Sequence, residues 1–246
     1  MEKSNIHEKI KLLTGSGMWH TQEVEDLPSV HLSDGPHGLR KQEEKERQNN
    51  VSLVSTCYPT ASALACSWDV TAAERLGRAV AKEAWNADVA VLLGPGINMK
   101  RSPLCGRNFE YFSEDPFLAG RLGAAYVSAA QGEDVAVSLK HFAANNQETN
   151  RQTANSQIDE RALREIYLSA FEYVVKTARP ATIMASYNRL NGYYACENRH
   201  LLTEILREEW GFDGVVISDW GACADLAKAV KAGMDLEMPD SHGIHA

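Results

Sequence analysis

The sequence predicts an α/β protein folded as a (β/α)8 barrel of the TIM type, with an irregular start expected. Short apolar runs rich in valine, isoleucine and leucine alternate with amphipathic segments along most of the 246 residues. This alternation is typical of buried parallel strands joined by helices. A doubly wound open sheet is the alternative, but neither a GxGxxG nor a GxxxxGK[ST] motif marks a nucleotide-binding turn. We therefore favour the barrel.

Five apolar runs are the expected strands, because each is too short for a typical helix. They occupy residues 88–96, 134–142, 180–188, 213–220 and, more briefly, 233–239. Strand signals are weaker in the first third of the chain, where a long loop separates PSVHLSDGPHGLR from YPTASALACSWD. The irregular part of the barrel is therefore expected at its beginning.

The clearest expected helix spans residues 159–178. Its apolar side chains follow the spacing of one helical face, and they are Leu163, Ile166, Tyr167, Ala170, Phe171, Val174 and Val175. The segment 114–132 opens with Asp115 as a capping residue and Pro116 in the first turn. Residues 68–87 and 201–211 supply two more helices, with Asn or Gly near their ends.

Charge and hydropathy argue against several classes of protein. A net charge of −8 argues against a nucleic-acid partner, and the charged run at 41–47 is typical of a solvated loop. No apolar stretch approaches the roughly 20 residues that cross a bilayer, so no membrane partner is expected. The N-terminal MEKSNIHEKIKLL is charged and amphipathic, unlike a signal peptide.

The five cysteines contain no CxxC pair, which argues against a disulfide framework and a zinc site. Reduced thiols fit a cytoplasmic protein. The HxxH spacing in DSHGIH at 240–245 is more typical of a solvated tail than of a metal site. We expect neither a metal nor a cofactor.

Polar side chains follow four of the expected strands, where a buried strand should not tolerate them. They are Lys140 with His141, Tyr187 with Asn188, Asp219 with Trp220, and Glu237. In a barrel these groups project at the C-terminal rim, where barrel enzymes build their active sites. The loops add Asp34, Arg107, Glu148 and Arg151. A pocket this dense in hydrogen-bonding groups suits a polyhydroxylated ligand.

Each of these residues also has a purely structural interpretation. An aspartate after a strand is more often a helix cap or a turn residue than a catalytic group. Lys140 could form a Schiff base or a salt bridge, and Trp220 could pack in the core. The arginines at 107 and 151 could simply pair with the glutamates at 110 and 148. His141 is as typical of a hydrogen-bonded structural residue as of a ligand.

Five ordered motifs resemble the barrel domain of family 3 glycoside hydrolases, most closely the β-glucosidases. They are SDGPHGLR, GRNFEYFSEDP, SLKHFAANNQETNR, MASYN and GVVISDW, and they extend over nearly the whole chain. The resemblance implies that Asp219, in the SDW motif, is the nucleophile that attacks the anomeric carbon. It also implies a set of sugar-binding residues, namely Asp34, Arg107, Lys140, His141, Arg151 and Tyr187, with Trp220 flanking the sugar.

The implied function is that of a retaining exo-β-glycosidase, most simply a β-glucosidase that releases a terminal glucose from a β-linked oligosaccharide or glucoside. A β-xylosidase or another exo-glycosidase of the family is the alternative. Outside this class, the chain could be a Schiff-base lyase that uses Lys140, or a non-catalytic carbohydrate-binding or assembly subunit.

A retaining glycosidase needs an ionised carboxylate roughly 5 Å from a second carboxyl group that serves as acid and base. We expect the cationic neighbours of Asp219 to lower its pKa, and the Tyr187 hydroxyl to hydrogen-bond to it.

The chain departs from the family pattern in one respect that concerns catalysis. The family's β-glucosidases normally draw the acid/base glutamate from an α/β sandwich domain after the barrel. We therefore expect residues 1–246 to be a catalytic barrel fragment without its acid/base, whose partner is the missing second domain of the same enzyme. Neither Glu148 nor Glu237 matches the family's acid/base position. The N-acetylglucosaminidase branch is disfavoured, because KHF is followed by AANNQETNR where that branch has a KHFPGHGD-like motif.

Overall fold

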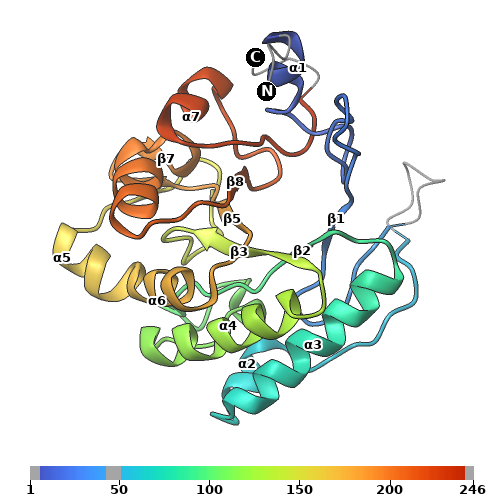
Figure 1. Cartoon of the computed structure of the whole chain (residues 1–246). Helices are drawn as coiled ribbons and strands as arrows, with labels where there is room; N and C mark the ends of the chain where they lie inside the picture. Colours follow the sequence, from blue (N-terminus) through green and yellow to red (C-terminus); the bar gives the residue numbers. More distant parts are fainter. Residues whose placement is uncertain (1–5, 43–50, 242–246) are drawn as a thin grey trace.

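The computed structural model describes residues 6–42 and 51–241. Within them, five parallel strands form the central sheet in the order β1, β2, β3, β5 and β8 (Figure 1). Their bounds are Leu32–Asp34, Val91–Leu93, Ala136–Phe142, Thr182–Ala185 and Val215–Ser218. The last four lie inside the runs expected as strands. Most of the charged run at 41–47 and of the HxxH segment lies outside the described residues.

Short backbone bridges continue the sheet beyond β8 and close it into a ring. They join Ile217 to Leu236, Thr14 to Glu237, Gly15 to Thr21 and His20 to His31. His31 immediately precedes β1, so the result is an α/β barrel with an irregular start, as expected. The strand expected at 233–239 is only a bridged segment. Here the Asp235 carboxylate accepts the Val216 N–H at 2.7 Å, in place of a backbone carbonyl.

Apolar side chains fill both sides of the barrel wall. The interior cluster consists of Leu32, Val91, Leu93, Met184, Ile217, Leu236 and Met238. A larger cluster, which includes Leu92 and Val137, lies between the sheet and the helices. Because successive strand residues face opposite sides, burial on both sides explains why strands such as β2 and β5 are largely apolar in sequence.

Helices cover the outside of the sheet. The longest are α3 (Val70–Asn86), α4 (Pro116–Gln131) and α6 (Ser169–Ala178), which pack side by side (Figure 1). Asp115 caps α4 by accepting the Phe117 N–H at 2.9 Å, and Pro116 occupies the first turn, as expected. Shorter helices are α1 (Ile6–Lys11), α2 (Ala61–Ala65) and α7 (Leu226–Ala232). Among the described residues, no helix combines the length and the apolar character that crossing a membrane requires.

The helix expected at 159–178 is interrupted by a π-helical turn. Its parts are α5 (Glu160–Ala162), η2 (Leu163–Tyr167) and α6. The Leu168 N–H donates to the carbonyl of Leu163, five residues back, at 2.9 Å. The extra residue in the turn places Leu168 in the core and leaves Ile166 37% exposed, so the expected place of Ile166 on the buried face is wrong. The helix expected at 201–211 is also π-helical, as η4 (His200–Glu209).

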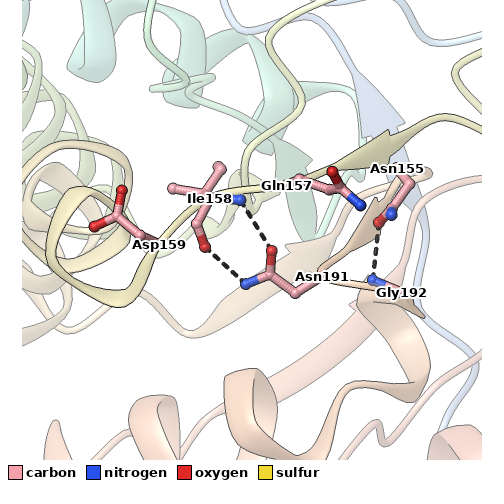
Figure 2. Close-up of a pocket in the computed structure, with 6 residues that line it drawn as sticks. All are labelled: Asn155, Gln157, Ile158, Asp159, Asn191 and Gly192. Atoms are coloured by element: carbon pink, nitrogen blue, oxygen red, sulfur yellow. Dashed lines mark hydrogen bonds between the residues drawn. The ribbon is translucent and has the colours of Figure 1, made fainter.

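A small second sheet joins two loops at the rim of the barrel. It contains β4 (Asn155–Ser156), β6 (Arg189–Leu190) and β7 (Tyr193–Tyr194). Two short 3-10 turns, η1 (Asn108–Glu110) and η3 (Ala195–Glu197), lie elsewhere in the rim loops. The Asn191 side chain exchanges two hydrogen bonds of 2.9 Å with the backbone of Ile158 (Figure 2). These contacts tie the loop after β3 to the loop after β5.

Candidate active site

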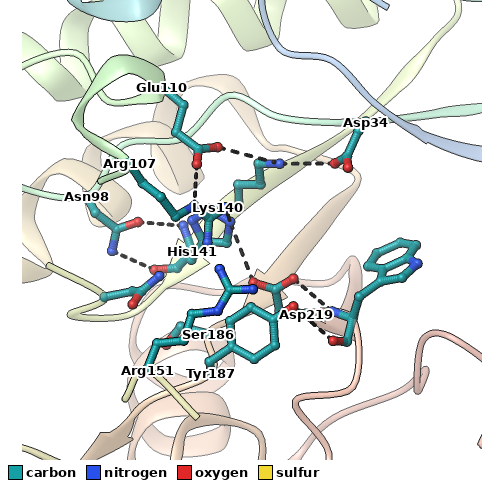
Figure 3. Close-up of polar contacts among 12 residues, drawn as sticks. Asp34, Asn98, Arg107, Glu110, Lys140, His141, Arg151, Ser186, Tyr187 and Asp219 are labelled. Atoms are coloured by element: carbon teal, nitrogen blue, oxygen red, sulfur yellow. Dashed lines mark hydrogen bonds and ion pairs between the residues drawn. The ribbon is translucent and has the colours of Figure 1, made fainter. Parts of the chain in front are cut away.

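A small cavity of about 210 Å³ opens at the C-terminal rim of the barrel. All eight residues predicted for the site line it, namely Asp34, Arg107, Lys140, His141, Arg151, Tyr187, Asp219 and Trp220. Figure 3 shows the network of polar contacts among them. The roles assigned to these residues remain predictions. Trp19 and Met184 also line the cavity; the sequence reasoning missed both, because neither follows an expected strand.

Asp219 directly follows β8 and is 6% exposed. Its backbone N–H donates to the Ala185 carbonyl at 2.9 Å, and its Oδ1 accepts the Trp220 N–H at 2.8 Å. Its Oδ2 is buried and has no hydrogen-bond partner among the described residues. Burial raises the pKa of Asp219, and Arg107 and Lys140 offset this effect only in part. The expected lowering of its pKa is therefore wrong, because desolvation outweighs the attraction of the cations.

His141 lies next to Asp219 as a neutral ring. Burial lowers its pKa well below the usual value, and the cations Arg107, Lys140 and Arg151 lower it further. Arg107 Nη2 lies 2.7 Å from His141 Nε2, and a guanidinium can only donate, so Nε2 is the acceptor. The proton is then on Nδ1, which faces the Tyr111 hydroxyl at 3.0 Å. The separation of 3.6 Å between Nε2 and Asp219 Oδ2 is therefore no ion pair, and Oδ2 stays free for a ligand.

Two cations of the cavity share one buried carboxylate. Lys140 Nζ lies 3.4 Å from Asp34 Oδ1 and 3.9 Å from Glu110 Oε2. Glu110 Oε1 accepts a hydrogen bond from Arg107 Nε. The sequence suggested that Glu110 could pair with Arg107, three residues before it, but gave no sign of the contact with Lys140.

Arg151 is held from two sides. Its Nη1 lies 3.0 Å from Glu148 Oε2, and its guanidinium carbon lies 4.3 Å from the centre of the Tyr187 ring. The Tyr187 hydroxyl donates to the Trp220 carbonyl at 2.9 Å. The Tyr187 hydroxyl also interacts with the Asp219 carboxylate, as expected, but its well-formed hydrogen bond goes to the neighbouring backbone. Burial raises the pKa of Tyr187, and the nearby Asp219 charge adds to this effect.

Two indole rings give the cavity an apolar wall. The ring centres of Trp19 and Trp220 are 5.1 Å apart. Their N–H groups donate outside the cavity, from Trp220 to the Met18 carbonyl at 2.8 Å and from Trp19 to Gln42 Oε1 at 3.0 Å. The indole rings are thereby fixed beside the polar groups.

Three residues expected at the rim do not line the cavity, namely Glu148, Asn188 and Glu237. Glu237 is 1% exposed and accepts a hydrogen bond from the Ser241 hydroxyl at 3.0 Å. Its neighbours Leu236 and Met238 belong to the interior cluster, so Glu237 faces the other side of the barrel wall. Asn188 instead donates to the Ala143 carbonyl at 3.2 Å.

Comparison with known proteins gives matches over nearly the whole chain. The family described as "Glycosyl hydrolase family 3 N terminal domain" matches residues 36–245. Thermostable beta-glucosidase B of Acetivibrio thermocellus is 53% identical, over 99% of this chain and 33% of its own length. The exo-alpha-(1->6)-L-arabinopyranosidase of Bifidobacterium longum is 50% identical, over 96% of this chain and 32% of its own length.

Solved structures match equally well. The crystal structure of the GH3 beta-glucosidase of Bifidobacterium adolescentis superposes with a TM-score of 0.92 at 49% identity, covering 98% of this chain and 35% of that one. Beta-glucosidase 3B of Thermotoga neapolitana in complex with glucose gives 0.91 at 42% identity, covering 96% and 35%. The chain therefore spans about a third of the length of these relatives.

Proposed function

The chain belongs to glycosyl hydrolase family 3, as its motifs predicted, and we propose that it is the barrel domain of a retaining exo-β-glycosidase. The proposed reaction releases terminal glucose from a β-glucoside or a β-linked oligosaccharide. Relatives between 42% and 53% identical support this assignment, since several of them are β-glucosidases.

The observation that carries the proposal is the free Oδ2 of Asp219. Leaving a buried acceptor without a hydrogen bond costs about 1–3 kcal/mol, and more for a charged group. Such an atom in a native protein needs an explanation, and a catalytic role is one. Oδ1 is held by the Trp220 N–H at 2.8 Å, which leaves Oδ2 for attack on an anomeric carbon.

The rest of the cavity supports a sugar ligand. Lys140 and Arg107 offer charged donors and Asp34 offers a carboxylate acceptor, and bonds of this kind to ring hydroxyls can strengthen in the transition state. The volume of about 210 Å³ lies below the roughly 300–1,000 Å³ of pockets for drug-sized ligands. This size suits a single sugar ring, and hence removal of one terminal residue.

We propose that the acid/base comes from a second domain of the same enzyme. Two glutamates beside the cavity residues are held in ion pairs, Glu110 with Arg107 and Lys140, and Glu148 with Arg151. The matched relatives are about three times as long as this chain, which leaves ample length for a further domain.

A second candidate is an exo-glycosidase for another terminal sugar. The 50% identical arabinopyranosidase favours it, because that relative acts on a different sugar. A Schiff-base lyase is less well supported. Lysines of that kind are activated by desolvation or by another cation, whereas Lys140 Nζ lies near two carboxylates.

We also propose that the protein works in the cytoplasm. All five cysteines lie within the described residues and are free, which agrees with a reducing compartment.

Hydrolysis of nitrophenyl β-glucoside by the complete enzyme that contains this chain tests the proposed function. Asp219→Asn keeps the size of the side chain and removes the nucleophile, so we expect kcat to fall by a factor on the order of 10⁴ to 10⁶. The matched control is Asp213→Asn, which removes an exposed carboxylate paired with Arg179 before the same strand. An Asp219→Asn enzyme within tenfold of the wild type would contradict the proposal.

A further inference from the structure

Glu110 contacts two of the proposed sugar-binding cations without lining the cavity itself. Its Oε1 accepts from Arg107 Nε, and its Oε2 lies 3.9 Å from Lys140 Nζ (Figure 3). The residue is 6% exposed. A buried carboxylate is costly unless cations or hydrogen-bond donors compensate it, and the reaction proposed above does not use it.

The backbone fixes Glu110 beside Lys140. Gly96 forms parallel bridges to both Tyr111 and Lys140, so it lies between the segment that carries Glu110 and strand β3. A Cβ at Gly96 would lie 3.0 Å from the Tyr111 ring and 3.1 Å from the Glu110 carbonyl oxygen, which is closer than most Cβ atoms approach a neighbour. The short turn η1 is anchored from outside by the Ser62 hydroxyl, which donates to the Asn108 carbonyl at 2.7 Å.

Without the Glu110 charge, Arg107 would keep only Glu148, at 4.0 Å, and Lys140 only Asp34, at 3.4 Å, as ion-pair partners among the described residues, so both would be attracted more strongly to the Asp219 carboxylate. Arg107 Nη2 already lies 2.7 Å from His141 Nε2, which in turn lies 3.6 Å from Asp219 Oδ2. Attraction between buried charges is strong over such distances. A guanidinium or ammonium that has lost one of its two carboxylate partners would therefore turn toward Asp219 and occupy the oxygen that has to stay free.

We propose that Glu110 is a positioning residue: it holds Arg107 and Lys140 in place for a sugar in the cavity and keeps both from pairing with Asp219. This inference rests on the proposed function.

The test is Glu110→Gln in the complete enzyme, which preserves size and the acceptor for Arg107 but removes the charge. Displacing groups that position a substrate can cost about 10²-fold in rate, and we expect a loss of that order in kcat/KM for nitrophenyl β-glucoside. Glu110→Asp keeps the charge at a shorter reach and should recover part of the loss.

The pH profile separates positioning from a general structural role. The charged and titratable groups around Asp219 are Arg107, Tyr111, Lys140, His141, Arg151, Tyr187 and Cys196, and those around Glu110 are His37, Arg107, Tyr111 and Lys140. Asp34 faces Lys140, and Glu148 faces Arg107. Loss of the Glu110 charge strengthens the field of the two cations at Asp219, which favours its ionised form. The acidic limb of kcat/KM should therefore move to lower pH in Glu110→Gln and stay in place in Glu110→Asp.

The control is Glu133→Gln, because Glu133 also lies near two cations, Arg78 at 3.2 Å and Lys82 at 3.9 Å, but on the surface. Glu133→Gln should match the wild type in kcat/KM and in the acidic limb.

If the wild-type enzyme hydrolyses no glycoside, the proposed function fails. If the wild type is active and Glu110→Gln shows wild-type kcat/KM, or a loss with an unmoved acidic limb, the positioning role is overturned. Should Glu110→Gln not fold, Glu110→Asp decides: a raised KM supports the role and a wild-type KM overturns it.

Discussion

Lys140 is the residue whose removal should affect the proposed sugar site most directly. Its side chain is 5% exposed, and its Nζ lies 3.4 Å from Asp34 Oδ1 and 3.9 Å from Glu110 Oε2. We choose Lys140→Met, because methionine keeps most of the length and volume of the buried stem while it removes the ammonium group. The barrel should remain folded, so that kinetics report on the charge.

The expected magnitude follows from two losses. A hydrogen bond to a charged group contributes about 1.5–3 kcal/mol, and a buried acceptor left unsatisfied costs about 1–3 kcal/mol. The two ranges add to about 2.5–6 kcal/mol, and we expect the lower part of that range, about 3–4 kcal/mol, because the Asp34 side chain is 35% exposed and water can solvate it. Since about 1.4 kcal/mol corresponds to a factor of ten, kcat/KM should fall by a factor on the order of 10² to 10³.

The assay measures kcat and KM for nitrophenyl β-glucoside in the complete enzyme, with the circular dichroism spectrum as a check on folding. Lys176→Met is the matched control, because Lys176 lies on the surface of α6 and pairs only with Glu172 among the contacts described. A folded Lys140→Met enzyme with near wild-type kcat/KM would remove Lys140 from the sugar site and refute this reasoning.

Three further predictions follow from the same structure. The isolated 246-residue chain should hydrolyse nitrophenyl glucoside better than cellobiose, because a nitrophenolate leaves without the protonation that contributes about 10² to 10⁴ in rate; efficient cellobiose cleavage would instead place an acid/base within the chain. Burial raises the pKa of Asp219, and the ionised form is the nucleophile. Activity should thus be lost, as pH falls, at a pH above the ordinary aspartate value of about 3.9, and a limb at or below that value would count against Asp219. Gly77→Ala should lower the Tm although alanine favours helices, because its Cβ would lie 2.5 Å from the Tyr126 carbonyl oxygen; Gly120→Ala, whose nearest contacts lie at 3.4 Å, should be tolerated.

The sequence predicted the regular part of the fold well, for a physical reason. Strands such as β2 and β5 are buried on both sides, so their sequences are largely apolar, and polar groups that follow a strand, such as Asp219 after β8, stand out. Asp115 and Pro116 likewise begin α4 as local capping rules predict. These signals depend on a few neighbouring residues and are visible without knowledge of tertiary structure.

Features that depend on tertiary packing could not be predicted in the same way. The π-helical turn at Leu163–Tyr167 changes which side chains face the core, and a regular period of 3.6 residues hides it. The pKa of Asp219 rises because the folded cavity excludes water, an effect that no list of nearby cations reveals. Glu110 reaches Lys140 only because Gly96 lies between their two segments.

In the site, too, the residues in local motifs were predicted, and those placed by tertiary packing were not. The eight predicted residues lie in recognisable motifs at strand ends and in rim loops, and all of them line one cavity. Trp19 comes from the irregular start of the barrel, where no periodic pattern indicates which side chains face inward. Glu237 was misplaced because its chain segment continues the barrel wall, so that alternate side chains face opposite sides.

We propose that Asp219 Oδ2 attacks the anomeric carbon and forms a covalent glycosyl-enzyme. Reaction of the complete enzyme with a 2-deoxy-2-fluoro-glucoside bearing a good leaving group should trap that intermediate, and mass spectrometry of the digested protein locates it. We expect one glycosyl adduct, on the peptide that contains Asp219. An adduct on a peptide with Glu110, Glu148 or any other carboxylate, and none on Asp219, would contradict it.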